Sequence, residues 1–261
     1  PMKLAAMEGL YEGKEGANIV AMGLLNPEKQ YDNDEETFIV KMDVPIPKLL
    51  SLLGYRDADA FVPDVRDIIE GYTLSDGTVV PSFAEKQASG KKAIQALNDY
   101  REAKAAGNDS LAVTHKAVLD ENFKNFGYGY LEKPADLIPN VALVFYSFHI
   151  MVALGMVFLV IFMAVWFFHW KKKLENVRWL LWGSLFSIPL GYLATQLGWV
   201  VAEVGRQPWA IQDVLPVQAA VSSVSTGSVQ LTFFLFLALF TALLIAEIRI
   251  MVKQIQKGPG E

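Results

Sequence analysis

The run VALVFYSFHIMVALGMVFLVIFMAVWFF, residues 141–168, decides the fold of this chain. It contains no Asp, Glu, Lys or Arg, so nothing in it opposes burial in lipid. At 1.5 Å per residue its helix would cover about 42 Å, which exceeds the roughly 30 Å hydrocarbon core of a bilayer. We therefore expect a membrane-spanning helix that tilts or projects from the bilayer.

Two further apolar segments, residues 179–202 and 229–251, are also long enough to span. Basic residues flank the first connection and follow the third span: Lys171, Lys172, Lys173, Arg178, Lys253 and Lys257. The second connection, 203–228, holds only Arg206. By the positive-inside rule the first connection and the C-terminus are cytoplasmic, and residues 1–139 lie outside.

Composition divides the chain in the same way. Residues 1–139 hold 15 Lys and Arg against 23 Asp and Glu, whereas residues 140–261 hold 8 against 5. The balances of −8 and +3 give the net charge of −5. The absence of cysteine excludes disulfides, iron–sulfur clusters and thiolate haem ligation. We expect an all-α fold: residues 140–261 form the three-helix portion of a membrane bundle, preceded by an extracytoplasmic, partly helical loop domain at 1–139.

Within the external region we expect residues 9–48 to be irregular or mobile. Residues 9–48 are rich in Gly, Pro and acids, which favours an irregular segment. Residues 63–72 form a short helix candidate. The apolar periodicity of 83–106 and 110–126 predicts a helical hairpin that turns at 107–109.

The stretch GWVVAEVGRQPW, residues 198–209, places a carboxylate and a guanidinium at the end of the second span. Charges at that depth cost roughly 2.5–3.5 kcal/mol each unless they are paired. In a persisting helix, Trp199 and Glu203 share a face, with Arg206 one turn beyond, until Pro208 ends the helix. Either the pair is a surface ion pair, or Glu203 faces a cofactor or proton path while Arg206 holds an anionic group such as a propionate.

His149 and Met151 lie inside the first span. His and Met are common haem ligands, although a histidine in a helix is more often a hydrogen-bonding residue and a methionine more often packs. Two residues apart, they point to different sides of the helix. At the start of the chain, Lys3 and Glu8 flank an apolar stretch that suits a helix at the membrane surface, or they are simply solvated.

Three of these motifs together are similar to subunit I of cytochrome bd-type quinol oxidases. They are the run GRQPW at 205–209, the opening PMKLAAME at 1–8 and the run IMVA at 150–153. The resemblance covers residues 139–261 and the first eight residues well, and is loose from 9 to 138. It implies an enzyme that oxidises quinol and reduces dioxygen to water, generating a proton-motive force.

The resemblance also implies cofactors: a low-spin and a high-spin haem b, and haem d. Met151 resembles the axial methionine of the low-spin haem b, and Glu203 resembles the carboxylate at the high-spin haem b, so both are expected metal ligands. Arg206 resembles the arginine that meets haem propionates, and Trp199 the tryptophan between the haems. His149 stands where the family usually has an arginine, so its effect on haem redox poise, or even a role as a competing ligand, is open.

For the quinol, Lys3 and Glu8 resemble the family's loop residues. We expect Glu8 to accept a proton and Lys3 to hydrogen-bond a quinone oxygen. The family's preceding spans, with their histidine haem ligands, are not in this sequence, which is expected to be a piece of subunit I or the product of a split gene.

Expected partners are therefore that missing portion, subunit II, a small accessory subunit and membrane lipid, without nucleic acid. The expected location is a bacterial cytoplasmic membrane. The alternative is a non-enzymatic three-span sensor or assembly subunit with an external domain. It explains the hydropathy equally well, but not Trp199, Glu203 and Arg206 together.

Overall fold

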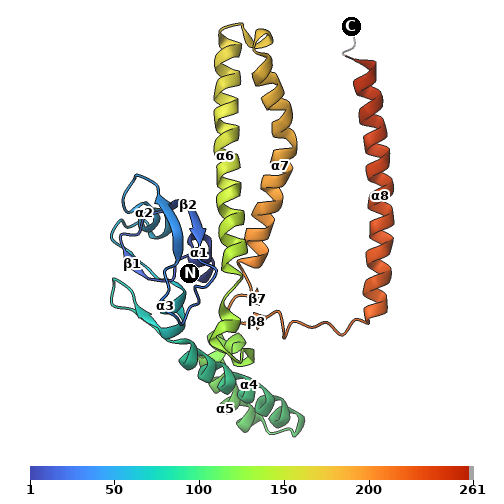
Figure 1. Cartoon of the computed structure of the whole chain (residues 1–261). Helices are drawn as coiled ribbons and strands as arrows, with labels where there is room; N and C mark the ends of the chain where they lie inside the picture. The colour runs from blue at the N-terminus through green and yellow to red at the C-terminus, as the bar shows by residue number, and fades with distance from the viewer. Residues whose placement is uncertain (259–261) are drawn as a thin grey trace. The chain divides into compact units, whose positions relative to one another are not determined.

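The computed structural model describes residues 1–258, and the chain is built mainly from α-helices (Figure 1). Three helices are long and apolar enough to cross a bilayer: α6 (Val141–Trp170), α7 (Arg178–Val204) and α8 (Thr226–Lys257). They confirm the three expected spans. Each continues past its apolar run, because hydropathy marks only the apolar part of a helix whose backbone hydrogen bonds extend into polar residues.

Helices α6 and α7 pack side by side as an antiparallel hairpin, closed by the short 3-10 helix η3 (Leu174–Asn176). The side chain of Asn140 caps α6 by accepting the amide of Leu143 at 3.0 Å. Figure 1 shows α7 bowed along its length, and Pro189 lies inside it. A proline removes one backbone hydrogen bond from a helix, which accounts for the bend.

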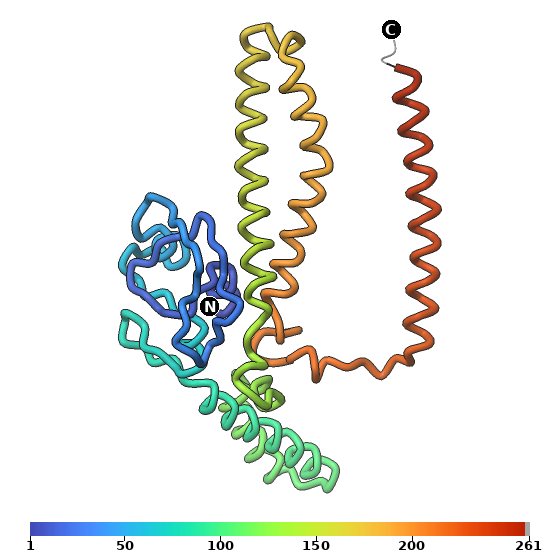
Figure 2. Tube along the Cα trace, viewed as in Figure 1, coloured from blue at the N-terminus to red at the C-terminus, as the bar shows by residue number. Residues whose placement is uncertain are grey.

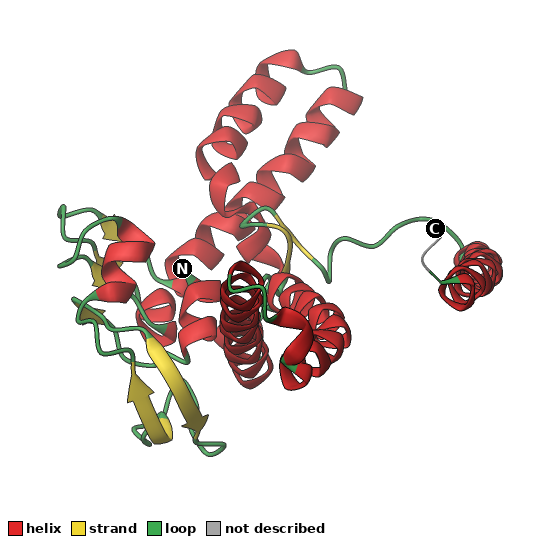
Figure 3. Cartoon of the chain, turned by 90° about the horizontal axis from the view of Figure 1, so that it is seen from above, coloured by secondary structure: helices red, strands yellow, loops and turns green. Residues whose placement is uncertain are grey.

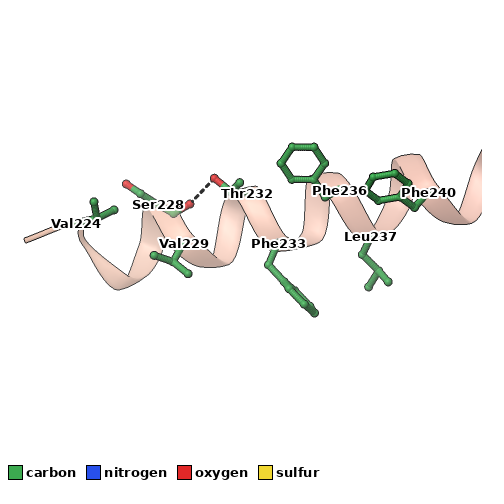
Figure 4. A pocket seen from close by; sticks show the side chains of 8 residues that line it. All are labelled: Val224, Ser228, Val229, Thr232, Phe233, Phe236, Leu237 and Phe240. Carbon is green, nitrogen blue, oxygen red and sulfur yellow. Dashed lines mark hydrogen bonds between the residues drawn. The ribbon is translucent and has the colours of Figure 1, made fainter. Parts of the chain in front are cut away.

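Helix α8 belongs to a separate unit that begins at Val221. Ser225 caps its start by accepting the amide of Ser228 at 3.3 Å. Figure 4 shows one face of α8, where a hollow of about 600 Å³ is lined mainly by apolar side chains, including Phe233, Phe236 and Phe240. None of its lining side chains is titratable, so this face offers packing surface rather than acid–base chemistry.

The expectation that residues 9–48 are irregular is wrong. They contain β1 (Lys14–Glu15) and an antiparallel hairpin of β2 (Val20–Leu25) and β3 (Phe38–Asp43), while β1 pairs with β4 (Phe61–Val62). The Gly, Pro and acidic residues mark the turns, but the Val, Ile and Phe residues between them favour strands. Figure 3 shows these strands gathered in one part of the molecule.

The rest of this region is a set of short elements. Helix α2 (Leu49–Tyr55) follows β3, and α3 (Val65–Glu70) confirms the helix predicted at 63–72. A small ladder of β5 (Tyr72–Thr73) and β6 (Val79–Val80) then leads to the helical hairpin.

The predicted helical hairpin is confirmed as α4 (Phe83–Ala105) and α5 (Asp109–Asn122), with Gly107 at φ +70° in the turn. The second helix ends earlier than predicted, and the chain continues as the 3-10 helices η1 (Phe123–Tyr130) and η2 (Pro134–Leu137). Figure 3 shows the hairpin projecting away from the strands.

Helix α1 (Met2–Glu8) is held between two small hydrophobic clusters. Ala5 packs in one with Val65, Phe83 and Trp209, among others. Ala6 packs in the other, which comprises Val141, Val144 and Val201 from α6 and α7. Both alanines are fully buried, so α1 lies close against α6 although more than a hundred residues separate them in sequence (Figure 2). This packing fixes both ends of α1.

Candidate functional site

The two ends of α1 place the predicted site residues in different neighbourhoods. Lys3, near its start, lines the same cavity as Glu203 and Arg206. Glu8, at its end, is buried and linked through strand β2 to His149. Lys3 and Glu8, which the resemblance assigns to one quinol site, lie near the two ends of the seven-residue helix α1.

Glu203 and Arg206 form an ion pair at the end of α7. The guanidinium Nη2 lies 2.5 Å from Glu203 Oε2, and the two side chains are 48% and 41% exposed. Helix α7 ends at Val204, before the predicted stop at Pro208, so Arg206 lies just beyond the helix. The residue before a proline disfavours helical backbone, which explains why the helix ends early.

Lys3 reaches the same place because position 205 has no side chain. A Cβ at Gly205 would lie 3.1 Å from Lys3 Cγ and 2.6 Å from the carbonyl oxygen of Val201. The lysine stem therefore packs over the end of α7, beside the ion pair. Glycine at 205 is required for this close approach.

The cavity that these residues line has a volume of about 670 Å³, and we call it the Arg206 cavity. Its walls come from α1, α3, α4, η1, α7 and the residues that follow α7. Its charged side chains are Lys3, Lys86, Glu203, Arg206 and Asp213. The cavity is thus lined by groups from both residues 1–139 and the end of a span.

The contact between Tyr128 and Asp213, which both line this cavity, was not predicted from the sequence. Asp213 lies in the turn between β7 (Trp209–Ile211) and β8 (Leu215–Pro216). The Tyr128 hydroxyl donates to Asp213 Oδ1 at 2.9 Å, and Gln212 donates to the same oxygen at 2.8 Å. Burial raises the pKa of Tyr128, and the Asp213 carboxylate raises it further, so the phenol remains a donor.

Backbone and ring contacts reinforce that connection between η1 and the β7–β8 hairpin. The Gly127 amide donates to the Asp213 carbonyl at 2.8 Å. The rings of Tyr128 and Trp209 have centroids 5.0 Å apart, and Trp209 is almost fully buried. A side chain at Gly127 would meet the Trp209 ring at 2.6 Å. The loop after α7 is therefore fastened to η1, the segment that follows the helical hairpin.

Glu8 is 2% exposed, which is unusual for a carboxylate. Its Oε2 accepts the amide of Val20 at 2.9 Å. Burial raises the pKa of Glu8, and the hydrogen bond from Val20 opposes that shift. A carboxylate in such surroundings is a better proton acceptor than an exposed one.

His149 connects α6 to the same residue of β2. Its Nε2 lies 3.0 Å from the Val20 carbonyl oxygen and its Nδ1 lies 2.9 Å from that of Phe145, on whose ring it rests. A neutral imidazole can donate to only one of these oxygens, whereas the imidazolium donates to both. We call Glu8, Val20, Phe145 and His149 the buried cluster.

Met151 and Trp199 join neither neighbourhood. The Met151 sulfur lies against α7, 3.1 Å from where a Cβ at Gly198 would be, so His149 and Met151 point to different sides of α6 as predicted. Trp199 is 67% exposed on the surface of α7.

The predicted metal ligands, Met151 and Glu203, fit iron in a porphyrin better than a bare ion. Among residues 1–258, no three or more His, Cys, Asp or Glu side chains are grouped to hold a metal ion. A haem iron is already bound by four ring nitrogens and needs only one or two axial ligands, for which a thioether is suitable. Gly198 has no side chain, and a Cβ there would lie 3.1 Å from the Met151 sulfur, so glycine leaves room for that atom.

Comparison with known proteins decides the family. The family model described as cytochrome bd terminal oxidase subunit I matches residues 1–259. The chain belongs to this family. It is 32% identical over 265 residues to cytochrome bd-II ubiquinol oxidase subunit 1 of Escherichia coli (strain K12), covering 100% of this chain and 49% of that protein.

Two proteins of Bacillus subtilis (strain 168) are also similar. Cytochrome bd ubiquinol oxidase subunit 1 is 31% identical over 144 residues, which cover 55% of this chain and 30% of that protein. The putative cytochrome bd menaquinol oxidase subunit I is 30% identical over 115 residues, covering 43% and 25%. At most, then, this membrane chain spans about half the length of the curated relatives it matches.

Proposed function

We propose that this chain forms the quinol-binding and part of the haem-binding portion of a terminal respiratory oxidase. In that enzyme quinol is oxidised, dioxygen is reduced to water and a proton-motive force is generated. Membership of the family and the relatives' names, which include ubiquinol oxidase, support this proposal.

The observation on which the proposal depends is the buried cluster. Glu8 is linked through the two backbone groups of Val20 to His149, and His149 lies two residues from Met151. A buried base thus lies next to the helix segment that offers a haem ligand. Quinol oxidation requires such a neighbourhood, because the substrate loses protons and electrons together.

In this proposal each predicted haem-site residue has one role. Met151 would hold a low-spin haem b and Glu203 a high-spin haem b, while Arg206 would bind a haem propionate and Trp199 would contact the haems. Bound haem, including haem d at the oxygen site, supplies the electron acceptors and the oxygen chemistry.

The quinol is handled by α1 and the buried cluster. Glu8 accepts a proton from the quinol hydroxyl, and burial favours this by raising the pKa of Glu8. Lys3 provides a hydrogen bond to a quinone oxygen. His149, held between two carbonyl oxygens, keeps β2 against α6 so that the Val20 amide stays on Glu8.

The same proposal places the chain in a bacterial cytoplasmic membrane. Residues 1–139 form an external quinol-binding region, residues 140–261 the membrane region, and the C-terminus is cytoplasmic, because the basic residues gather in the α6–α7 connection and after α8. Its partners are the portion of subunit I with the histidine ligands, subunit II and a small accessory subunit.

The decisive experiment is a reduced-minus-oxidised visible spectrum of the purified complex, with Met151→Leu. We expect haem bands in the wild type and loss of the low-spin haem b band in the variant. The matched control is Met156→Leu on the same helix, where the side chain is 60% exposed. A colourless wild-type complex rejects the proposed function, and an unchanged spectrum in Met151→Leu rejects the ligand.

A further inference from the structure

Lys86 lines the Arg206 cavity, where its ammonium feels the charge of Asp213 but forms no direct ion pair with it. It lies in the first turns of α4, half-buried, with its ammonium 5.5 Å from the centre of the Tyr128 ring. Its backbone amide donates to the Ser82 carbonyl at 3.0 Å, but its ammonium is in no ion pair within residues 1–258. Burial lowers the pKa of Lys86, and the charge of Asp213 opposes this only in part.

The two acids of the cavity are already engaged. Glu203 is paired with Arg206 at 2.5 Å. Asp213 accepts hydrogen bonds from Tyr128 and Gln212. Three basic groups, Lys3, Lys86 and Arg206, thus face two carboxylates, so the side chains that line the cavity carry one positive charge in excess. A desolvated ammonium of this kind is stabilised by a charge-assisted hydrogen bond to an anion.

We propose that Lys86 binds a carboxylate that enters the Arg206 cavity, so that the external helix α4 supplies a second cation to a site headed by Arg206. This rests on the proposed function, in which Arg206 meets a haem propionate, and the same propionate is the carboxylate that Lys86 binds. Lys86 is a binding residue here and takes no part in proton transfer.

The test is a redox titration of the haems in the full purified complex, comparing wild type with Lys86→Met, Lys86→Arg and the control Lys92→Met. Lys92 is on the same helix but exposed. Reduction adds negative charge, so loss of a nearby cation disfavours it. We expect Lys86→Met to lower the ratio of reduced to oxidised haem about threefold at fixed potential, roughly 28 mV for one electron. Arg at 86 restores the ratio and Lys92→Met leaves it unchanged.

If the ratio of reduced to oxidised haem is unchanged in Lys86→Met, the inference is wrong. The proposed function is not affected by that result as long as the wild-type complex contains haem. Should Lys86→Met fail to assemble, Lys86→Gln is titrated instead. Haem loss in the neutral variants but not in Lys86→Arg supports the inference, whereas loss in all three overturns it, since shape rather than charge is then required. The titration is then repeated in sodium acetate and in sodium chloride. If wild type and Lys86→Met differ only in acetate, Lys86 binds a soluble carboxylate, and the proposal that it binds a haem propionate is wrong.

Discussion

The two ends of α1 face opposite kinds of environment. In the buried cluster every polar group has a partner from the chain itself: Glu8 accepts from Val20, and both nitrogens of His149 meet carbonyl oxygens. In the Arg206 cavity, cations outnumber the available acids, and about 670 Å³ is open. One end is built to keep a carboxylate from water, and the other to receive a charged ligand.

A single short helix can serve both environments because its middle is tightly packed. Ala5 and Ala6 are fully buried on two sides of α1, so the helix has no room to shift. Small residues allow this close packing, and packed interiors transmit displacement rather than absorb it. A change at one end is therefore expected to remain local only if it preserves the shape of α1.

Glu8→Gln, in the buried cluster, is expected to have the largest effect of the three substitutions. Glutamine has the same size and still accepts the Val20 amide, but it cannot take a proton. We expect turnover with quinol to fall about 100-fold, the range for loss of a general base. In the wild type, because burial raises the pKa of Glu8, turnover should begin to fall at a higher pH than for an ordinary glutamate as the medium is acidified.

The measurement is steady-state quinol oxidation, with the visible spectrum as the control for haem content. Glu15→Gln is the matched variant, since Glu15 is exposed in the same external region. Turnover of Glu8→Gln within twofold of the wild type would show that the buried carboxylate is structural.

Gly127→Ala should disturb the wall of the Arg206 cavity instead. The added methyl group would lie 2.6 Å from the Trp209 ring and 2.7 Å from the Asp213 carbonyl oxygen, so η1 and the β7–β8 hairpin must separate. Overpacking of this kind costs about 1–3 kcal/mol. We expect a lower thermal midpoint of the complex and faster proteolysis of the external region.

The control for this substitution is Gly54→Ala. A Cβ at Gly54 meets only the end of Leu4, at 3.6 Å, and the residue is in a helix, where alanine is favoured. Equal midpoints for Gly127→Ala and the wild type would mean that the Tyr128–Asp213 contact does not fasten the loop after α7.

The sequence predicted what depends on local pattern. The three spans follow from apolar length, the α4–α5 hairpin from periodicity, and the ionic partners Glu203 and Arg206 from their spacing of three residues. Tyr128 and Asp213 are 85 residues apart, and no periodic signal connects them. Lys86 was invisible for the same reason: it is one of several lysines on α4 until the fold places it in a cavity.

The faces of the helical hairpin show a second limit of pattern. Leu111 is one of the large apolar residues that give α5 its helical periodicity, but it is 51% exposed. The fully buried positions are instead small: Ala93 and Ala112. Hydrophobic periodicity weights residues by apolar area, whereas closely packed helices select for small side chains.

Asp64→Asn is expected to have the smallest effect of the three substitutions, because Asp64 does not itself line the Arg206 cavity. Asp64 is buried and caps α3, the helix whose Ile68 lines the Arg206 cavity. Burial raises the pKa of Asp64 to about 6. The folded state therefore holds this proton more tightly than the unfolded state, and its stabilising contribution is present at low pH and is lost as pH rises through about 6.

Asparagine also caps helices well but does not titrate, so the variant should lack this dependence. We expect the thermal midpoint of wild type relative to Asp64→Asn to fall by about 2–4 °C between pH 4.5 and 7.5, as about 1 kcal/mol would give. Asp120→Asn, at an exposed position of α5, should parallel the wild type. If the thermal midpoint of Asp64→Asn depends on pH as that of the wild type does, the proton on Asp64 does not stabilise α3. The packing of α3 against the Arg206 cavity is then independent of pH, unlike the buried cluster.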